Sequence, residues 1–337
     1  MSKWLILCAL PLLTSLILSR LIIRYFGRHL LDRPNNRSSH QIPTPRGGGI
    51  ALALGVVISV LTGWSFGHIN NAPLYWLLIP SGLIAILGIC DDLFNLKIGT
   101  RLAMQFLLSS VGLFFIGSQS ELSQSTQVLI AGPILLFIVW MTNLYNFMDG
   151  INGLAALQAL SVCMCMTFIY WILSTNTNII YLLIIIAASS LGFLFWNFPI
   201  AKLFMGDSGS LFLGLSFGLL TIESMNEGTH LAIAWLIMLG VFIVDASYTL
   251  FYRLATRQAF HLPHRTHAYQ KIAIKYNSHT YATLAIVTIN LVWLFPIAIA
   301  AAAKQLNYIA ALIIAYIPLL FFARKFHAGR IDHSPHK

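Results

Sequence analysis

Charged residues are scarce in this chain of 337 residues: Asp, Glu, Lys and Arg together make up 9% of it. A soluble domain is about a quarter charged and about half apolar, whereas this chain is 58% apolar and has a mean hydropathy of +0.79. So few polar side chains cannot cover a water-exposed surface. The composition therefore excludes an ordinary soluble protein and predicts an all-α, polytopic integral membrane protein.

Cysteine is also rare, because the chain contains only four. All four fall in or at the end of apolar runs, at Cys8, Cys90, Cys163 and Cys165. Residues two apart, such as the last pair, point to different faces of a helix. We interpret the four as small buried apolar residues and not as a disulfide or metal-binding set.

Apolar runs of about 17–25 residues are long enough to cross a bilayer. The sequence contains eleven such runs, of which the eighth is the weakest because it is short and rich in glycine. The first ends in arginines and shows no small-residue cleavage site, so it is interpreted as a span and not as a signal peptide. The predicted spans are 4–23, 48–67, 74–90, 102–117, 127–145, 153–174, 178–196, 209–224, 230–251, 280–302 and 306–323.

The distribution of basic residues predicts how these spans are oriented. With the N-terminus outside and the C-terminus inside, every Lys and Arg except Lys3 and Lys304 falls in or beside a cytoplasmic loop, as the positive-inside rule requires. Topology thus explains the net charge of +10, and no nucleic-acid partner is expected. We predict one transmembrane domain over 1–337, with cytoplasmic loops at about 24–47, 91–101, 146–152, 197–208 and 252–279 and a tail at 324–337.

Five of the ten acidic residues lie at or near the cytoplasmic ends of predicted spans: Asp91, Asp92, Asp149, Asp207 and Asp245. Carboxylates at a membrane boundary are costly unless they are paired, hydrated or metal-bound. Each one alone could be a helix cap. Together they indicate a site of hard oxygen ligands, and Mg²⁺ takes carboxylate oxygens together with those of phosphates.

Two acidic motifs lie at the ends of spans. Asp91 and Asp92 are adjacent, so they repel each other unless a cation or a shared proton lies nearby; one could bind a metal while the other takes a proton. Further along, Gly206-Asp207-Ser208-Gly209-Ser210 places a carboxylate at a predicted helix N-terminus, where main-chain N–H groups favour anions. Asp207 could there bring a metal to a phosphate, and a plain N-cap is the simpler alternative.

The segment NLYNFMDGINGLA, residues 143–155, has a polar helix face. Asn143, Asn146 and Asp149 follow at intervals of three, which keeps them on one side of a helix. A capped hairpin between two spans would need no such face. The pattern therefore favours a cleft that receives a polar ligand.

The loop 252–279 contains three evenly spaced histidines, His261, His264 and His267. This spacing could suggest zinc, but no Cys or clustered acid completes a set of four ligands. Contact of Arg265 and the histidines with a sugar or a diphosphate fits the loop better.

The early loop has a basic end that precedes a run of glycines. Arg37, His40 and Arg46 come before Gly47-Gly48-Gly49, which opens the second span. Two interpretations are equally good here: a positive-inside determinant with a flexible hinge, or contact with a phosphate.

Taken together, these motifs resemble those of the polyprenyl-phosphate N-acetylhexosamine-1-phosphate transferase family, and the resemblance covers nearly the whole chain. The matching positions are Asp91-Asp92 with Arg101 and Gln105 (Asp-Asp motif), Asn143, Asn146, Asp149 and Gly150 (Asn-x-x-Asn-x-x-Asp-Gly), Gly206–Ser210 (Gly-Asp motif), and Asp245, Arg253, Arg265 and His267 (final His motif). Four motifs in order at the right span ends are highly specific.

The chain departs from the family pattern at two places. Asn152 stands where the family commonly has a second Asp, and Tyr269-Gln270 follow where better-known members carry consecutive histidines. A role that needs negative charge at Asn152 is thus in doubt, although amide contact with a uracil ring is open. Two segments, RSSHQIPTPRGGG and HRTHAYQ, resemble those of the family branch that starts the synthesis of O-antigen or a related glycan.

The resemblance implies transfer of N-acetylhexosamine-1-phosphate from a UDP-sugar to undecaprenyl phosphate at the cytoplasmic face of a bacterial inner membrane, with release of UMP. It implies Mg²⁺, or Mn²⁺ in its place, at Asp207 with Asp92. Asp91, Asp92 and Asp149 are the expected catalytic residues; which of the first two is the base, and whether the route has one or two steps, is open. The expected substrate-binding residues are Asn143, Asn146, Asn152, Asp245, Arg265, His267, His264 and Arg46.

Two alternatives belong to other classes of protein. A cation- or proton-coupled transporter would carry relay acids near the midplane and broken helices in matching repeats, and neither is evident in the sequence. A membrane scaffold would not require Asp207 or Mg²⁺. A homodimer is left open: Gly214 and Gly218 form a small-xxx-small pair that suits either a dimer seam or packing within the chain.

Overall fold

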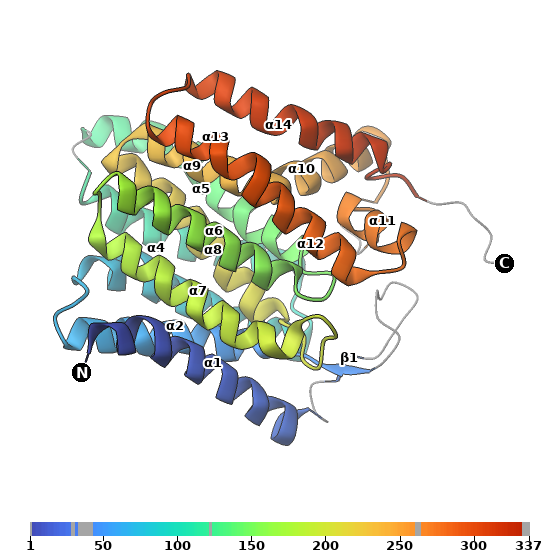
Figure 1. Ribbon diagram of the computed structural model, residues 1–337, viewed down its shortest axis with the longest axis horizontal. Coiled ribbons are helices and arrows are strands. Elements are labelled where there is room, and N and C mark those ends of the chain that lie inside the picture. The colour runs from blue at the N-terminus through green and yellow to red at the C-terminus, as the bar shows by residue number, and fades with distance from the viewer. Residues whose placement is uncertain (1, 28–30, 33–42, 121–122, 260–263, 332–337) are drawn as a thin grey trace.

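The computed structural model describes residues 2–27, 31–32, 43–120, 123–259 and 264–331. Within these ranges the chain is a bundle of long helices whose described N-terminal and C-terminal segments lie at opposite ends (Figure 1). The predicted all-α membrane fold is confirmed. Arg37, His40 and His261 lie outside the described residues.

The elements follow one another along the chain with short connections. Their bounds are η1 (Leu5–Ala9), α1 (Leu10–Leu21), η2 (Ile22–Phe26), β1 (Leu31–Asp32), β2 (Thr44–Pro45), α2 (Gly48–Ser65), η3 (Leu74–Leu78), α3 (Ile79–Phe94), α4 (Ile98–Gly117), α5 (Gln124–Phe147), α6 (Leu154–Ile172), α7 (Thr177–Asn197), α8 (Asp207–Glu227), α9 (Thr229–Met238), α10 (Gly240–Ala255), α11 (Ala268–Lys275), α12 (His279–Ile289), η4 (Asn290–Leu294), α13 (Phe295–Ala302) and α14 (Tyr308–Lys325).

The described residues contain ten helices that are long and apolar enough to cross a membrane, or eleven if the bent pair α9 and α10 is one span. Each coincides with a predicted span to within a few residues. In the site region α3 continues beyond the predicted span to Phe94 and so includes Asp91 and Asp92 in its last turn. Those two acids therefore have helical geometry and do not lie in a loop.

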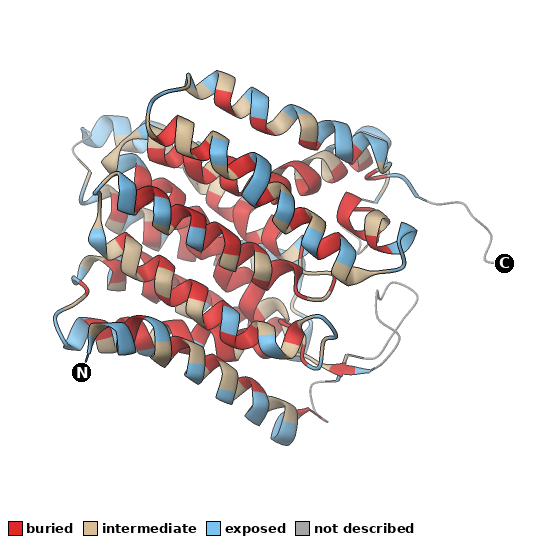
Figure 2. Ribbon diagram, in the orientation of Figure 1, coloured by how far each residue is buried: buried red, intermediate tan, exposed pale blue. Residues whose placement is uncertain are grey.

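Helix α8, the span with the weakest hydropathy, lies at the centre of the bundle. Within its most apolar window, 94% of the residues are buried inside the protein, and the centre of the bundle is correspondingly buried in Figure 2. A Cβ on Gly214 would lie 2.8 Å from the Thr142 Cα, and one on Gly218 would lie 3.3 Å from the Ile138 Cα. The small-xxx-small pair thus serves close packing of α8 against α5 within the chain, and not a dimer seam.

Helices α9 and α10 follow each other directly and are bent by 67° at Leu239. Two side chains take up carbonyl groups around the break: Gln158 Nε2 donates to the Met238 O at 3.3 Å, and Tyr316 Oη donates to the Leu236 O at 2.8 Å. In the absence of water, such groups need a partner from the protein. The sequence-based expectation concerned broken helices in matching repeats, so this single bent pair among the described residues is a feature that was not predicted.

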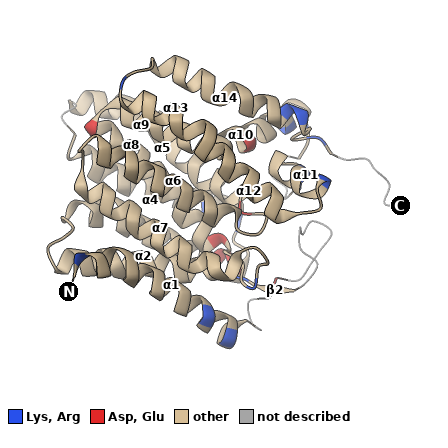
Figure 3. Cartoon of the chain, viewed as in Figure 1, with Lys and Arg blue, Asp and Glu red and all other residues tan. Residues whose placement is uncertain are grey.

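Two smaller elements were not predicted. The strands β1 and β2 form an antiparallel pair, Leu31 opposite Pro45, and α11 forms inside the loop that follows α10. Figure 3 shows that most described Lys and Arg gather at the end of the bundle that carries β2 and α11. The four cysteines are free, but only Cys163 and Cys165 are buried as expected, whereas Cys90 is half-buried and Cys8 is exposed.

Candidate active site

The C-terminus of α3 and the N-terminus of α8 cross almost in backbone contact. A Cβ on Gly88 of α3 would lie 2.5 Å from main-chain atoms of Asp207 and Ser208. The first turn of α2 packs on the same terminus, because a Cβ on Gly49 would collide with the Gly209 N. Only glycine allows an approach this close. This crossing brings the Asp91-Asp92 pair next to Asp207, although the two motifs are more than a hundred residues apart in the sequence.

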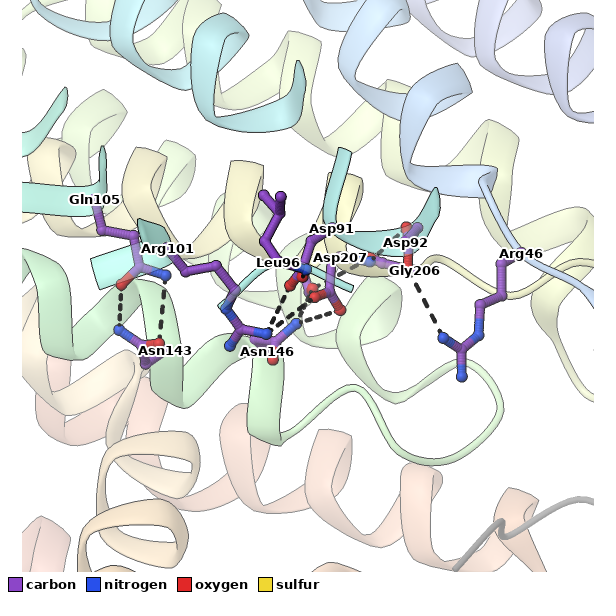
Figure 4. A network of polar contacts seen from close by, with 11 residues as sticks. Arg46, Asp91, Asp92, Leu96, Arg101, Gln105, Asn143, Asn146, Gly206 and Asp207 are labelled. Atoms are coloured by element: carbon purple, nitrogen blue, oxygen red, sulfur yellow. Dashed lines mark hydrogen bonds and ion pairs between the residues drawn. The ribbon is translucent and has the colours of Figure 1, made fainter. Parts of the chain in front are cut away.

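Arg101 of α4 bridges two of these carboxylates (Figure 4). Its Nη1 lies 2.6 Å from the Asp91 Oδ2 and 3.7 Å from the Asp207 Oδ2. The other Asp91 oxygen accepts the Leu96 N–H at 2.9 Å, which closes the turn after α3. Asp91 is thus buried, paired and fully engaged. The sequence placed Arg101 in a motif, but gave it no role of its own.

Asp92 caps the N-terminus of α8. Its Oδ2 accepts the Asp207 N–H at 3.0 Å, while Gly206, the N-cap residue, has no side chain to do so. The first turn of a helix favours an anion. The predicted anion site at this terminus is therefore filled by a carboxylate of the same chain, and Asp207 is the first helical residue and not the cap.

Asn146 connects α5 to the same cluster. Its Nδ2 donates to the Asp207 Oδ1 and to the Ser210 Oγ, both at 2.9 Å. Ser210 was quoted in the Gly-Asp motif without a role. The amide fixes the orientation of the Asp207 carboxylate and leaves its Oδ2 on the side of Arg101.

Asn143 lies one turn back along α5 and faces a different partner. It forms two amide hydrogen bonds with the buried Gln105 of α4, at 2.6 and 3.3 Å. Figure 4 shows this pair beside the carboxylate cluster and not within it. Its observed contacts hold α4 against α5.

Asp149 lies just beyond α5, in the turn that leads to α6, and is half-buried. Burial of its carboxyl group raises its pKa well above the usual value, and the negative charges of Asp207 and Asp92 raise it further. Because these charges interact, Asp149 belongs to the same electrostatic site. The structure thus brings together four of the five predicted acids.

Arg46 follows β2 and faces the cluster from another side. It pairs with Asp32 at 2.8 Å and lies 3.9 Å from the Asp92 Oδ1. The N–H groups of Gly48 and Gly49 donate to main-chain carbonyls at 2.9 and 2.8 Å. Those amides are occupied, so among the described residues of this loop the Arg46 side chain is the group that faces the cluster.

Asp245, the fifth acid, is not part of the carboxylate cluster in its observed contacts. Its two carboxylate oxygens accept the N–H groups of Ala268 and Tyr269 at 2.9 Å each, and the His267 Nδ1 lies 3.4 Å away. Asp245 thus anchors the start of α11 and orients the loop in front of it.

Residues 264–267, here called the histidine loop, lie directly before α11. The rings of His264 and His267 stack with their centroids 5.1 Å apart. Burial, together with the nearby His267 and Arg253, lowers the pKa of His264 to about 3, so this side chain is neutral at pH 7. Arg265 lies half-buried between the two histidines. His264 therefore adds no positive charge to this loop at pH 7.

Asn152 lies in the turn between α5 and α6. Its Nδ2 donates to the Pro199 O at 3.2 Å, and its main-chain O accepts from the Thr283 Oγ1 at 2.9 Å. These contacts tie the turn to the segment after α7 and to α12.

The donor set fits a hard divalent cation. Among the described residues no group of three His, Cys, Asp or Glu side chains has the arrangement of a metal cage. Mg²⁺ does not need one, because it is usually held by one or two carboxylates, substrate phosphates and waters. The Asp207 carboxylate, with Asp92 and Asp91 beside it, supplies oxygens of that kind. The same donor set does not suit zinc.

The fold and this cluster define a polytopic membrane protein with a carboxylate-rich site at the end of its helices. Residues 74–225, which include α3, α5 and the N-terminus of α8, match the model of glycosyl transferase family 4. The chain belongs to this family of polyprenyl-phosphate N-acetylhexosamine-1-phosphate transferases. The predicted resemblance is confirmed.

Three bacterial relatives illustrate the match. A probable undecaprenyl-phosphate N-acetylglucosaminyl 1-phosphate transferase from Bacillus subtilis is 34% identical, over 84% of this chain and 80% of the relative. The undecaprenyl-phosphate alpha-N-acetylglucosaminyl 1-phosphate transferase of Escherichia coli is 28% identical, over 77% and 75%. A phospho-N-acetylmuramoyl-pentapeptide-transferase from Pelagibacter ubique is 28% identical, over 71% and 75%.

Proposed function

We propose that the protein transfers N-acetylhexosamine-1-phosphate from a UDP-sugar to undecaprenyl phosphate and releases UMP. The observation that carries this proposal is the convergence of Asp91, Asp92 and Asp207 through Arg101 at the end of three helices. Such a site lies where a water-soluble nucleotide can meet a membrane-bound acceptor. The names of the relatives support the same chemistry.

The reaction forms one phosphorus–oxygen bond and breaks another. An oxygen of the lipid phosphate attacks the sugar-linked phosphorus, and the bond from that phosphorus to the UMP oxygen breaks, so UMP leaves with the bonding electrons. The second pKa of a phosphate is about 6, so the acceptor is largely ionised at neutral pH. Positioning therefore contributes more than proton removal. Asp91 fits this, because Arg101 and the Leu96 N–H already hold its oxygens.

Asp207 is the proposed principal ligand for Mg²⁺, with Asp92 as the second carboxylate. When bound, the cation would offset the repulsion between the two phosphate-bearing substrates and stabilise the charge on the departing UMP. Asn146 holds Asp207 in place, since its Nδ2 donates to the Oδ1 at 2.9 Å. Arg46 and Arg101 add fixed positive charge on either side of the cluster.

The remaining predicted residues divide between the two parts of the donor. The end of α5 and the turn after it are proposed to contact the nucleotide, through Asn146, Asp149 and Asn152. We propose that Arg265 and His267 contact the diphosphate or the sugar, with the His264 ring stacked on that of His267. For Asn143 and Asp245 we propose an indirect contribution to substrate binding, through the Gln105 pair and the start of α11.

The proposed setting is the inner membrane of a bacterium, with the site facing the cytoplasm. The described Lys and Arg gather at the end of the bundle where the histidine loop lies, which agrees with the positive-inside rule. We further propose that the product starts an envelope glycan of the O-antigen type.

The test is a donor panel with purified protein in detergent. Undecaprenyl phosphate, Mg²⁺ and the UDP derivatives of GlcNAc, GalNAc, FucNAc or QuiNAc are supplied, and UMP is measured. We expect release with at least one donor, loss with EDTA, and recovery with Mg²⁺ or Mn²⁺. Asp207→Ala should be inactive while remaining monodisperse. Absence of UMP with every donor, or full turnover by Asp207→Ala, contradicts the proposal.

A further inference from the structure

The first turn of α11 is tied to two different helices. On one side, the N–H of Tyr269 donates to the Asp245 Oδ2 of α10 at 2.9 Å. On the other side, the Tyr269 hydroxyl donates to the O of Phe147, the last residue of α5, at 2.9 Å. Tyr269 is 1% exposed, so this second bond is shielded from water. One side chain thus spans the space between the histidine loop and the turn after α5.

The turn after α5 packs directly on this hydroxyl. A Cβ on Gly150 would lie 2.1 Å from the Tyr269 Oη, which is inside any permitted contact, and 3.1 Å from the Gln270 Nε2. Asp149 immediately precedes that glycine. The position of the Asp149 main chain is therefore set by the tyrosine hydroxyl beneath it.

The same ring also holds His267. The centroids of the Tyr269 and His267 rings are 5.7 Å apart at 28°, and His267 in turn lies 6.3 Å from the ring of Phe147. His267 precedes Tyr269 by two residues and Asp149 follows Phe147 by two. The hydrogen bond of the Tyr269 hydroxyl and the stacked rings thus link the histidine loop to the turn after α5.

We propose that Tyr269 is a positioning residue that holds the Asp149 turn in register with His267. This inference rests on the proposed function, in which the two loops contact one donor substrate from two sides. Removing the hydroxyl leaves the Phe147 carbonyl without its partner and frees the turn to shift. A displacement of about 1 Å can cost on the order of a hundredfold in rate.

Tyr269→Phe tests the role of the hydroxyl while keeping the ring. We expect kcat to fall about tenfold, with the KM for each substrate within about twofold, because misalignment weakens the transition state more than ground-state binding. Tyr316→Phe is the matched control, since it also removes a tyrosine hydroxyl that donates to a main-chain carbonyl, at 2.8 Å. The control should lower Tm by a similar amount and keep kcat within about twofold.

A double variant tests the contact between the turn and the hydroxyl. Gly150→Ala alone should lower kcat about a hundredfold, because its Cβ collides with the Tyr269 Oη. In the Tyr269→Phe background the collision with the hydroxyl is removed, and the Cβ then lies 3.1 Å from the Gln270 Nε2 and 3.2 Å from the ring Cζ, contacts that small side-chain shifts relieve. The double variant should therefore be close to Tyr269→Phe alone. Such non-additivity is the signature of a direct contact.

Three outcomes would overturn the positioning role. The first is a Tyr269→Phe variant with unchanged kcat, and the second is a loss of kcat matched by Tyr316→Phe, which indicates a general loss of stability. The third is additive loss in the double variant. Each of these leaves the proposed function standing as long as the wild type releases UMP. A wild type without turnover on any donor overturns both proposals together.

Discussion

Because α3 and α8 cross almost in backbone contact, we expect one added methyl group at Gly88 to lower turnover strongly. Gly88→Ala would place a Cβ 2.5 Å from main-chain atoms of Asp207 and Ser208, whereas ordinary van der Waals contact begins at 3.4 Å. Since 3.4 − 2.5 = 0.9 Å, the N-terminus of α8 has to retreat by about 0.9 Å. Backbone cannot rotate away as a side chain can, so this shift is transmitted to Asp207. A misplacement of about 1 Å costs on the order of a hundredfold in rate.

Gly82→Ala provides the control, because it lies on the same helix and its Cβ would meet nothing within 4 Å. We expect Gly88→Ala to fold, with a destabilisation of about 1–3 kcal/mol from overpacking, and to release UMP about a hundredfold more slowly. Gly82→Ala should turn over within about twofold of wild type and gain roughly 0.5–1 kcal/mol in helix stability. Tm and gel filtration check folding. A folded Gly88→Ala with wild-type turnover would refute the view that this crossing sets the position of Asp207.

Four further substitutions, at three residues, test the electrostatics of the cluster by UMP release and Tm. Asn146→Asp should reduce turnover at least about tenfold, because it replaces the donor 2.9 Å from the Asp207 Oδ1 with a like charge; equal turnover contradicts that contact. Arg101→Ala should lower Tm, since Asp91 loses its partner at 2.6 Å, at a cost of about 1–3 kcal/mol, and Arg101→Lys should retain more of both properties. Asp149→Asn should lower turnover but raise Tm at pH 8. Below the ordinary pKa of an Asp, about 4, the Asp149 carboxyl group is protonated in both the folded and the unfolded protein and costs no stability. As the pH rises through the raised pKa of the folded state, the buried group has to ionise and the folded protein loses stability. The gain in Tm from Asp149→Asn should therefore vanish as the pH is lowered.

The sequence located the spans because hydropathy over about twenty residues is a strong signal. It underrated α8, whose Gly and Ser residues lower hydropathy but allow tight packing at the centre. Hydropathy measures compatibility with lipid and not burial against protein. The bend at Leu239 was missed for a related reason: the partners that stabilise it, Gln158 and Tyr316, are far away in the sequence.

The sequence also predicted that the acidic motifs share one face, but not which atoms meet. Asp92 caps a helix that begins 115 residues later, and this partnership has no local signature. Helix α11, in contrast, has a local signature, because His267 and Gln270 are three residues apart and form a capping box. Asp245 was grouped with the other acids because it is a carboxylate near the same face, whereas its observed partners are main-chain N–H groups.

The bend between α9 and α10 reopens the comparison with a transporter, because broken helices often line ion pathways. Two features of the described residues argue against that class. The bent pair has no counterpart among the other candidate spans, so no matching repeat is formed. Asp245, the acid on α10, has both oxygens committed to main-chain N–H groups and cannot relay a proton without releasing α11. Asp245 instead anchors the start of α11, which places the Tyr269 hydroxyl against the last residue of α5, so the observed role of this acid is to fix two loops relative to each other and not to carry an ion.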